Sequence, residues 1–279
     1  MATLSQLILY PIKSCAALPV TEAVATVSGL SALGVHDREW MLVTNEGQFL
    51  TQREFPRMAT IVPRVEGDAL LVTAPGMSPL RLALEQGKRT LRVQIWDDAV
   101  EALDCGDAAA AWFGDVLTTS CRLVRFKPDL ARPTSQKWTG GAPSSARFAD
   151  AYPLLLIGQA ALDEINARMR TAGRDAVPMD RFRPNLVVEG TDPFEEDYTE
   201  SFHTGDVAIR PVKPCARCPI PAIDQATGIP GPDPLDILQS WRGKAILDGA
   251  VCVGMNCIVT EGDGRVLRVG QPLEVSLSF

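Results

Sequence analysis

Two cysteines with proline and arginine neighbours form the segment of this chain with the most chemical potential. Lys213-Pro214-Cys215-Ala216-Arg217-Cys218-Pro219 places two thiols three positions apart, with an arginine between them. Proline fixes φ and lacks a backbone donor, so we expect a shaped loop here rather than a helix or a ladder strand. A cation beside a thiol favours the thiolate, which is the form that binds metal or attacks an electrophile. The sequence therefore predicts a chemical centre in this segment.

The spacing of these two thiols fits three kinds of site. As a zinc knuckle they would supply two of four ligands, and Cys252 and Cys257 are candidates for the other two. As a dithiol redox pair they should open a helix, which Pro219 and Pro221 disfavour. They would otherwise be two buried structural thiols.

Three further segments carry side chains that suit an anionic ligand. Lys13 and Ser14 follow a strand end and offer one point charge and one hydroxyl. Arg38 precedes another predicted strand, where it would fork onto a phosphate or pair with a neighbouring acidic residue at the surface. Arg183 and Asn185 are two positions apart, and in extended chain such residues share a face. Each segment taken alone also fits a solvated surface side chain.

The elements that must position these residues are mostly strands in the first 120 residues. Short apolar or alternating runs separated by turn residues predict strands, here at Leu7–Tyr10, Trp40–Thr44, Phe49–Thr51, Ala69–Thr73, Leu91–Trp96 and Val100–Leu103. A turn at Asn45-Glu46-Gly47 joins two of them. Short strands at this spacing are typical of a barrel or a rolled sheet. We interpret the acidic cluster at Trp96-Asp97-Asp98, Asp104 and Asp107 as turns and caps.

The second half of the chain combines strands with a few helices. Helices are predicted at Asp107–Phe113, at Gln159–Arg170 with one apolar face, and from Asp233 through Trp241. A strand-like run covers Val207–Val212. Residues 127–145 are rich in proline, glycine and hydroxyl side chains and predict a linker or long surface loop. We therefore expect one domain over residues 1–122 and another over 123–279.

Composition excludes several classes of protein. The 279 residues carry a net charge of −7 without a basic stripe, which argues against a nucleic-acid polymer as partner. No apolar run reaches the ~18 residues of a membrane span, and the N-terminus lacks a basic leader region. Seven cysteines and two histidines fit free thiols in a reducing compartment, so we expect a cytoplasmic location.

The order of these motifs resembles the MOSC family, named for the C-terminal domain of molybdenum cofactor sulfurase. The chain is most similar to bacterial relatives of the mitochondrial amidoxime-reducing component. The resemblance runs through the motifs Tyr10-Pro11-Ile12-Lys13-Ser14-Cys15, Asp37-Arg38-Glu39-Trp40, Phe148-Ala149-Asp150-Ala151-Tyr152-Pro153, Arg181-Phe182-Arg183-Pro184-Asn185, Lys213–Cys218 and Val253-Gly254-Met255-Asn256. It implies a mixed α/β, β-dominated fold, with an N-terminal β-barrel-like domain and a MOSC β-barrel with flanking helices.

The resemblance also implies a site and a cofactor. Cys218 would ligate the metal of a molybdenum cofactor (Mo-molybdopterin) and serve as the catalytic cysteine. Contacts to the pterin and its phosphate would come from Lys13, Ser14, Arg38, Ala151, Tyr152, Arg183, Asn185, Ala216, Arg217, Gly254 and Asn256. Ala151 and Tyr152 differ from the hydroxyl residues of the mitochondrial enzymes, so we expect backbone contacts there. A soft thiolate and several cations suit such a group.

The implied function is an oxidoreductase that removes oxygen from N-hydroxylated compounds such as hydroxylamines, amidoximes and N-hydroxylated bases. The sequence has no C-x4-C-x2-C run for an iron–sulfur cluster, so electrons are expected from a separate iron–sulfur or haem protein with its reductase. The alternative is a carrier that holds the cofactor or sulfur on the same cysteine. A structural zinc protein is the third hypothesis.

Overall fold

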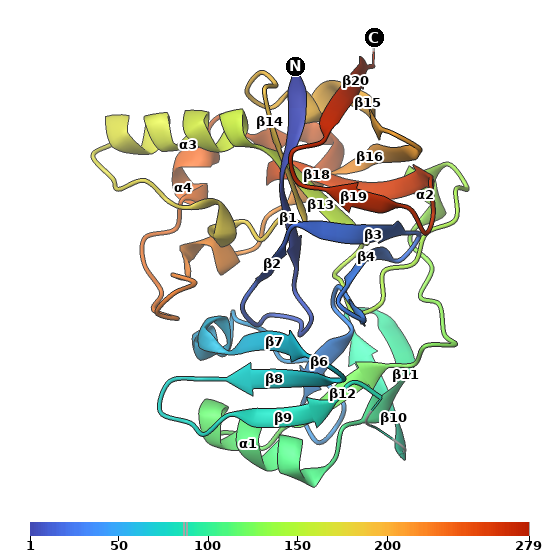
Figure 1. Cartoon of the computed structure of the whole chain (residues 1–279). Coiled ribbons are helices and arrows are strands. Elements are labelled where there is room, and N and C mark those ends of the chain that lie inside the picture. Colours follow the sequence, from blue (N-terminus) through green and yellow to red (C-terminus); the bar gives the residue numbers. More distant parts are fainter. Residues whose placement is uncertain (86, 88, 279) are drawn as a thin grey trace.

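Strands dominate the architecture of the chain. The computed structural model describes residues 1–85, 87 and 89–278. Figure 1 shows a strand-rich upper part that contains both termini and a lower part built from β6 to β12 and α1. The predicted fold class, β-dominated with a barrel and flanking helices, is confirmed.

Seven strands close into a barrel that unites the two ends of the chain. Their order is β13-β14-β1-β20-β15-β16-β18, and β18 pairs back onto β13. The bounds are β1 (Ala2–Leu9), β13 (Leu154–Gly158), β14 (Leu186–Glu189), β15 (Thr199–Thr204), β16 (Val207–Ala216), β18 (Ala250–Glu261) and β20 (Pro272–Leu277). The N-terminal strand β1 is antiparallel to both β14 and β20, so it completes a barrel whose other strands come from the C-terminal half of the chain.

Three smaller sheets surround the barrel or lie below it. One contains β10 (Arg89–Ile95), β11 (Asp98–Asp104), β12 (Arg122–Phe126) and β6 (Trp40–Val43). The others contain β7 (Val62–Glu66), β8 (Ala69–Thr73) and β9 (Leu80–Ala83), and β19 (Val266–Arg268), β3 (Glu22–Thr26), β4 (Gly29–Ala32) and β5 (Val35–His36). Short strands β2 (Leu18–Val20) and β17 (Gly243–Lys244) pair with β1 and β18.

Helices are short and peripheral. They are α1 (Asp107–Leu117), α2 (Gln136–Thr139), α3 (Gln159–Thr171) and α4 (Leu235–Leu238), with 3-10 turns η1 (Pro56–Thr60), η2 (Met179–Arg181), η3 (Glu195–Tyr198), η4 (Ile220–Ala222) and η5 (Ala245–Leu247). The predicted helices at α1 and α3 are confirmed, whereas the third covers one turn only. In the described part of the chain, no helix combines the length and the apolar character needed to cross a bilayer.

The apolar face of α3 explains how this helix covers the barrel. Leu162, Ile165 and Met169 follow helical spacing, and all three are buried in one cluster with Ile157 of β13 and Val187 of β14. Burying each such side chain is worth roughly 1.5–3 kcal/mol relative to exposure. The helix is therefore fixed by packing on the parallel pair β13 and β14.

The structure corrects two local predictions. The cysteine segment was expected to be a loop, but β16 continues through Pro214 and Cys215 to Ala216, with Pro214 opposite Met255 of β18. The ladder tolerates the prolines because its register shifts on both sides of them, as bulged strands do. The strand expected at Phe49–Thr51 is reduced to a single bridge between Val43 and Phe49.

Residues 127–145 are irregular apart from α2, yet they are anchored to the body of the protein. Arg132, Thr134 and Ser145 are buried, which a free surface loop would not show. The Arg132 guanidinium donates to the carbonyls of Ala149 (2.8 Å) and Asp150 (2.9 Å) and pairs with Asp98. This buried arginine therefore fixes the segment that leads into β13.

Candidate functional site

A pocket lies where the barrel meets the smaller sheets. Eleven of the twelve residues predicted for the site line it: Lys13, Ser14, Arg38, Ala151, Tyr152, Arg183, Asn185, Ala216, Arg217, Cys218 and Asn256. Thr51, Arg53, Trp96, Ala149, Asp150, Leu154, Leu155, Phe182, Cys215 and Ile220 complete the lining. Segments from the whole length of the chain thus meet at one concave site.

The charge of this pocket opposes that of the protein. Its described lining contains five cationic side chains, Lys13, Arg38, Arg53, Arg183 and Arg217, and one carboxylate, Asp150. The whole chain carries −7. Such a local excess of guanidinium and ammonium groups is the arrangement that binds phosphate or another anion.

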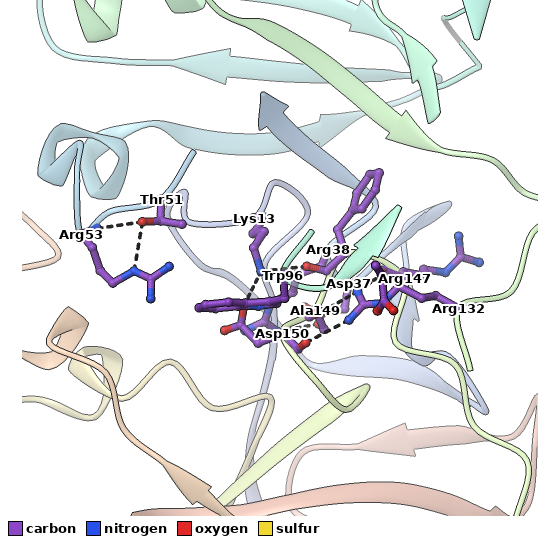
Figure 2. Close-up of polar contacts among 12 residues, drawn as sticks. Lys13, Asp37, Arg38, Thr51, Arg53, Trp96, Arg132, Arg147, Ala149 and Asp150 are labelled. Carbon is purple, nitrogen blue, oxygen red and sulfur yellow. Dashed lines mark hydrogen bonds and ion pairs between the residues drawn. The ribbon is translucent and has the colours of Figure 1, made fainter. Parts of the chain in front are cut away.

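Lys13 is held at the pocket wall by two oxygens. Its ammonium donates to Asp150 Oδ1 at 2.5 Å and to the Phe148 carbonyl at 3.0 Å (Figure 2). Burial lowers the pKa of the Lys13 ammonium, and the attraction of Asp150 opposes that effect. The side chain of Lys13 is 6% exposed and that of Asp150 is 65% exposed, so the carboxylate is the open end of the pair.

Arg38 forms an ion pair with its neighbour Asp37. One interpretation of the sequence expected such a pair at the surface, but the structure places it in a largely buried position. The Arg38 guanidinium lies 2.5 Å from Asp37 Oδ2 and donates to Asn185 Oδ1 at 3.1 Å. Asp37 is buried and also accepts the backbone N–H of Tyr10 at 2.7 Å. Burial raises the pKa of Asp37, and Arg38 opposes this by favouring the carboxylate. The pair therefore fixes Arg38 against the barrel.

Tyr10 is a platform for two of the cations. The guanidinium carbons of Arg38 and Arg183 lie 4.3 and 4.2 Å from the centroid of its ring. Burial raises the pKa of the Tyr10 hydroxyl to about 12, so the ring stays neutral at physiological pH. Cation–π contacts with such a desolvated ring help to orient both guanidiniums, and Arg38 is held by Asp37 as well.

Arg183 shares the pocket with Asn185, but not for the reason expected. The stretch is not extended, because Arg183 has a left-handed backbone with φ of 57°. Its guanidinium donates to the carbonyl of Cys15 at 2.7 Å and to Gln225 Oε1 at 2.9 Å. Asn185 accepts from Leu155 N and donates to the Ile8 carbonyl, which ties the pocket floor to β1 and β13.

The cysteine segment forms one wall of the pocket. Cys215 lies on β16, and Cys218 follows the strand; both thiols are partly exposed. The Arg217 guanidinium donates to Cys215 Sγ at 3.3 Å and to the Phe182 carbonyl at 2.7 Å. Its Nε is buried without a partner among the residues that the structure describes. Arg217 therefore contacts the thiol of Cys215, whereas the thiol of Cys218 lines the pocket without this contact.

The zinc hypothesis is not supported by the geometry. Within residues 1–85, 87 and 89–278, no three cysteine, histidine or acidic side chains gather closely enough to hold a metal ion. Cys252 and Cys257 are buried, and their thiols lie against the carbonyls of Ala250 and Met255. Burial raises the pKa of Cys252 to about 11, which disfavours the thiolate that zinc requires.

Gly254 is the one predicted site residue outside the described pocket lining. Its φ is 74°, and a Cβ at this position would lie 2.6 Å from the Leu156 carbonyl and 2.5 Å from Ile157 Cγ1. The glycine therefore allows β18 to approach β13. Asn256, two residues on, lines the pocket and donates to the carbonyl of Lys213 at 3.3 Å.

Of the ten lining residues that were not predicted for the site, three bear most on its chemistry: Arg53, Trp96 and Asp150. Trp96 and Asp150 were assigned to a turn and to a family motif, and Arg53 was given no role. Figure 2 shows Trp96 and Asp150 grouped with Lys13, and Arg53 beside Thr51. A signal was present for Trp96, since a tryptophan next to two aspartates is an unusual residue for a hairpin turn.

Comparison with known proteins yields consistent matches. Residues 1–120 match the MOSC N-terminal beta barrel domain, and residues 143–274 match the MOSC domain. Mitochondrial amidoxime reducing component 2 of Homo sapiens is 35% identical over 248 residues, covering 87% of this chain and 73% of that protein. Mitochondrial amidoxime-reducing component 1 of Homo sapiens is 32% identical, with 98% and 82% covered. Molybdenum cofactor sulfurase of Danio rerio is 29% identical over 88% of this chain, which spans 31% of that longer protein.

Proposed function

Because the chain belongs to the MOSC-domain family that includes the mitochondrial amidoxime-reducing components, we propose that it is a molybdenum-cofactor reductase of N-hydroxylated compounds. The observation that carries the proposal is the pocket itself. It combines an accessible thiol, Cys218, with five cations in an acidic protein. Thiolate suits molybdenum, and guanidinium groups suit an anionic pterin phosphate.

The residues present fit such a cofactor. Cys218 would ligate the metal, while Lys13, Arg38 and Arg183 would hold the phosphate and pterin. Tyr10 orients Arg38 and Arg183 before the cofactor binds, so less side-chain entropy is lost on binding. The buried Nε–H of Arg217, which has no partner among the described residues, could donate a hydrogen bond to the cofactor. When bound, the cofactor would supply two-electron removal of oxygen from N–OH.

The electrons would come from a second protein. We expect an iron–sulfur or haem donor with its reductase, docking transiently near the pocket mouth. Purified protein should then reduce hydroxylamine with dithionite and remain inactive with NADH alone. Turnover with NADH as sole donor, in a preparation free of flavoprotein, would remove the need for a separate donor.

Metal analysis and activity together test the proposal. Protein from a host that makes the cofactor should contain molybdenum and should reduce hydroxylamine with a chemical reductant. Bound molybdenum without reduction of any N-hydroxylated compound would favour the carrier alternative, which the sulfurase relative suggests. Zinc would refute both, whereas no metal at all would refute the reductase and leave only a carrier of sulfur.

A further inference from the structure

Trp96 occupies a backbone position that a tryptophan rarely takes. Ile95 pairs with Asp98 across β10 and β11, so Trp96 and Asp97 form a two-residue turn. Trp96 has φ of 52°, at the turn position where glycine, asparagine or aspartate is usual. A bulky residue with positive φ costs about 1 kcal/mol or more. The hairpin alone therefore gives no reason for this residue.

The side chain of Trp96 faces the pocket. Its indole N–H donates to Asp150 Oδ1 at 3.1 Å, and its ring lies 5.1 Å from that of Phe49. The residue lines the pocket and is 44% exposed. An aromatic surface is thus anchored at the pocket mouth by one hydrogen bond and one ring contact.

Arg53 lies on this aromatic surface. Its guanidinium carbon is 4.7 Å from the centroid of the Trp96 ring, and its Nε donates to Thr51 Oγ1 at 3.3 Å (Figure 2). Among the residues described, Arg53 has no carboxylate partner within ion-pair distance, and it is exposed. A planar, delocalised cation therefore rests on the indole with little else to hold it.

Asp150 completes the arrangement. The hydrogen bonds from Lys13 and Trp96 both end on its Oδ1. The side chain is 65% exposed, so a carboxylate oxygen is accessible to a ligand beside the indole. A planar group stacked on Trp96 would therefore meet an acceptor for its N–H groups.

We propose that Trp96 and Asp150 form a substrate-selecting wall for planar, conjugated N-hydroxylated groups such as amidoximes and N-hydroxyguanidines. The guanidinium of Arg53 occupies the stacking position in the free protein and is displaced by the substrate. This inference rests on the proposed function, because it concerns the substrate of that site. Trp96 is a specificity residue in this scheme, and Arg53 is its internal competitor.

Steady-state kinetics with two substrates test the wall. Benzamidoxime has a planar conjugated head, whereas hydroxylamine has nothing to stack. Trp96→Gly, which also relieves the positive φ, should raise the KM for benzamidoxime at least about five-fold relative to the KM for hydroxylamine. Trp96→Phe keeps a ring but loses the N–H, so its ratio of the two KM values should lie between those of wild type and Trp96→Gly. Trp138→Phe is the matched control, since Trp138 also has a cation near its ring, Lys213, but lies outside the described pocket lining.

Ligand binding gives a readout that needs no turnover. In calorimetry, benzamidine, which lacks the N–OH group, should bind Arg53→Gln about three-fold more tightly and Trp96→Gly at least about five-fold more weakly than wild type. Cyclohexylamine, a cation without a planar head, reports the effect of the lost Arg53 charge alone. Its affinity should rise less than that of benzamidine in Arg53→Gln and should be unchanged in Trp96→Gly.

The outcomes separate this inference from the proposed function. If wild type reduces both substrates but Trp96→Gly and Trp96→Phe match Trp138→Phe in KM ratio and benzamidine affinity, the wall is refuted and the reductase stands. If wild type reduces neither, the proposed function fails, and the substrate assignment of the wall falls with it. A benzamidine affinity that rises no more than that of cyclohexylamine in Arg53→Gln would refute displacement.

Discussion

The Arg183 guanidinium lies 4.2 Å from the centre of the Tyr10 ring, although 173 positions of sequence separate the two residues. Tyr10 follows β1, and Arg183 precedes β14, which pairs with β1. The stack is therefore a consequence of the barrel ladder. Burial lowers the pKa of the Arg183 guanidinium, and contact with the neutral ring is one of the interactions that support its charge.

Replacing Arg183 should release the cofactor more than it unfolds the protein. Arg183→Lys keeps the charge but loses the planar fork that contacts Cys15 and Gln225. We expect cofactor affinity to fall about ten-fold, measured as occupancy after gel filtration. Arg181→Lys is the control, because Arg181 pairs with Asp224 outside the described pocket lining. Equal occupancy in the two variants would contradict the assignment.

The two pocket cysteines should differ sharply in their effect on metal content. Cys218→Ser should lose most bound molybdenum, because a hydroxyl is a harder and less acidic ligand than a thiol. Cys215→Ser should retain it, since Cys215 lies on β16 and accepts from Arg217. Metal content per protein by mass spectrometry measures both. Equal loss would indicate that both thiols bind the metal.

Glu196 should make stability fall as pH rises. It is 1% exposed, one of its carboxylate oxygens accepts Gly158 N–H, and burial raises its pKa from 4.5 to about 7. Between these two values the folded protein binds more protons than the unfolded chain, so the free energy of unfolding declines with rising pH. The decline should approach about 3 kcal/mol above pH 7.

Urea unfolding at pH 5 and pH 8 checks this effect. Glu196→Gln should remove most of the difference between the two pH values, because the amide keeps the bond from Gly158 without a titrating proton. Glu195→Gln, a change at the neighbouring partly exposed carboxylate, should keep the wild-type slope. A pH-independent wild type would show that Glu196 does not titrate in this range.

Gly254 should be intolerant of any side chain. Gly254→Ala would combine positive φ with a methyl group 2.6 Å from the Leu156 carbonyl, and we expect at least about 2 kcal/mol of destabilisation. Gly249→Ala has a similar φ of 79° but no atom within 4 Å of the added Cβ. The difference between the two variants in urea unfolding isolates the clash from the backbone strain, and equal losses would show that β18 yields at this point.

Local pattern was sufficient for regular elements and for the identity of most pocket residues. Helix α3 was predictable because its buried residues repeat at helical spacing. The position of Cys215 in a strand could not be predicted in this way, because the bulges that admit Pro214 depend on pairing with β18, some 40 residues later. The roles of Trp96 and Asp150 were hidden for a similar reason. They meet only after a hairpin and an anchored loop from different parts of the chain have folded.

The place of β1 in the barrel has a consequence for how the protein is made. Residues Ala2–Leu9 are synthesised before their partners in β14 and β20, which begin at Leu186 and Pro272. The barrel therefore cannot close before β20 is made, and until β14 is made β2 is the one partner of β1 among the described strands that is available, along Leu7–Leu9. Such a delay lowers the folding rate and exposes a strand to wrong partners. Closure of the barrel is thus tied to the synthesis of Pro272–Leu277.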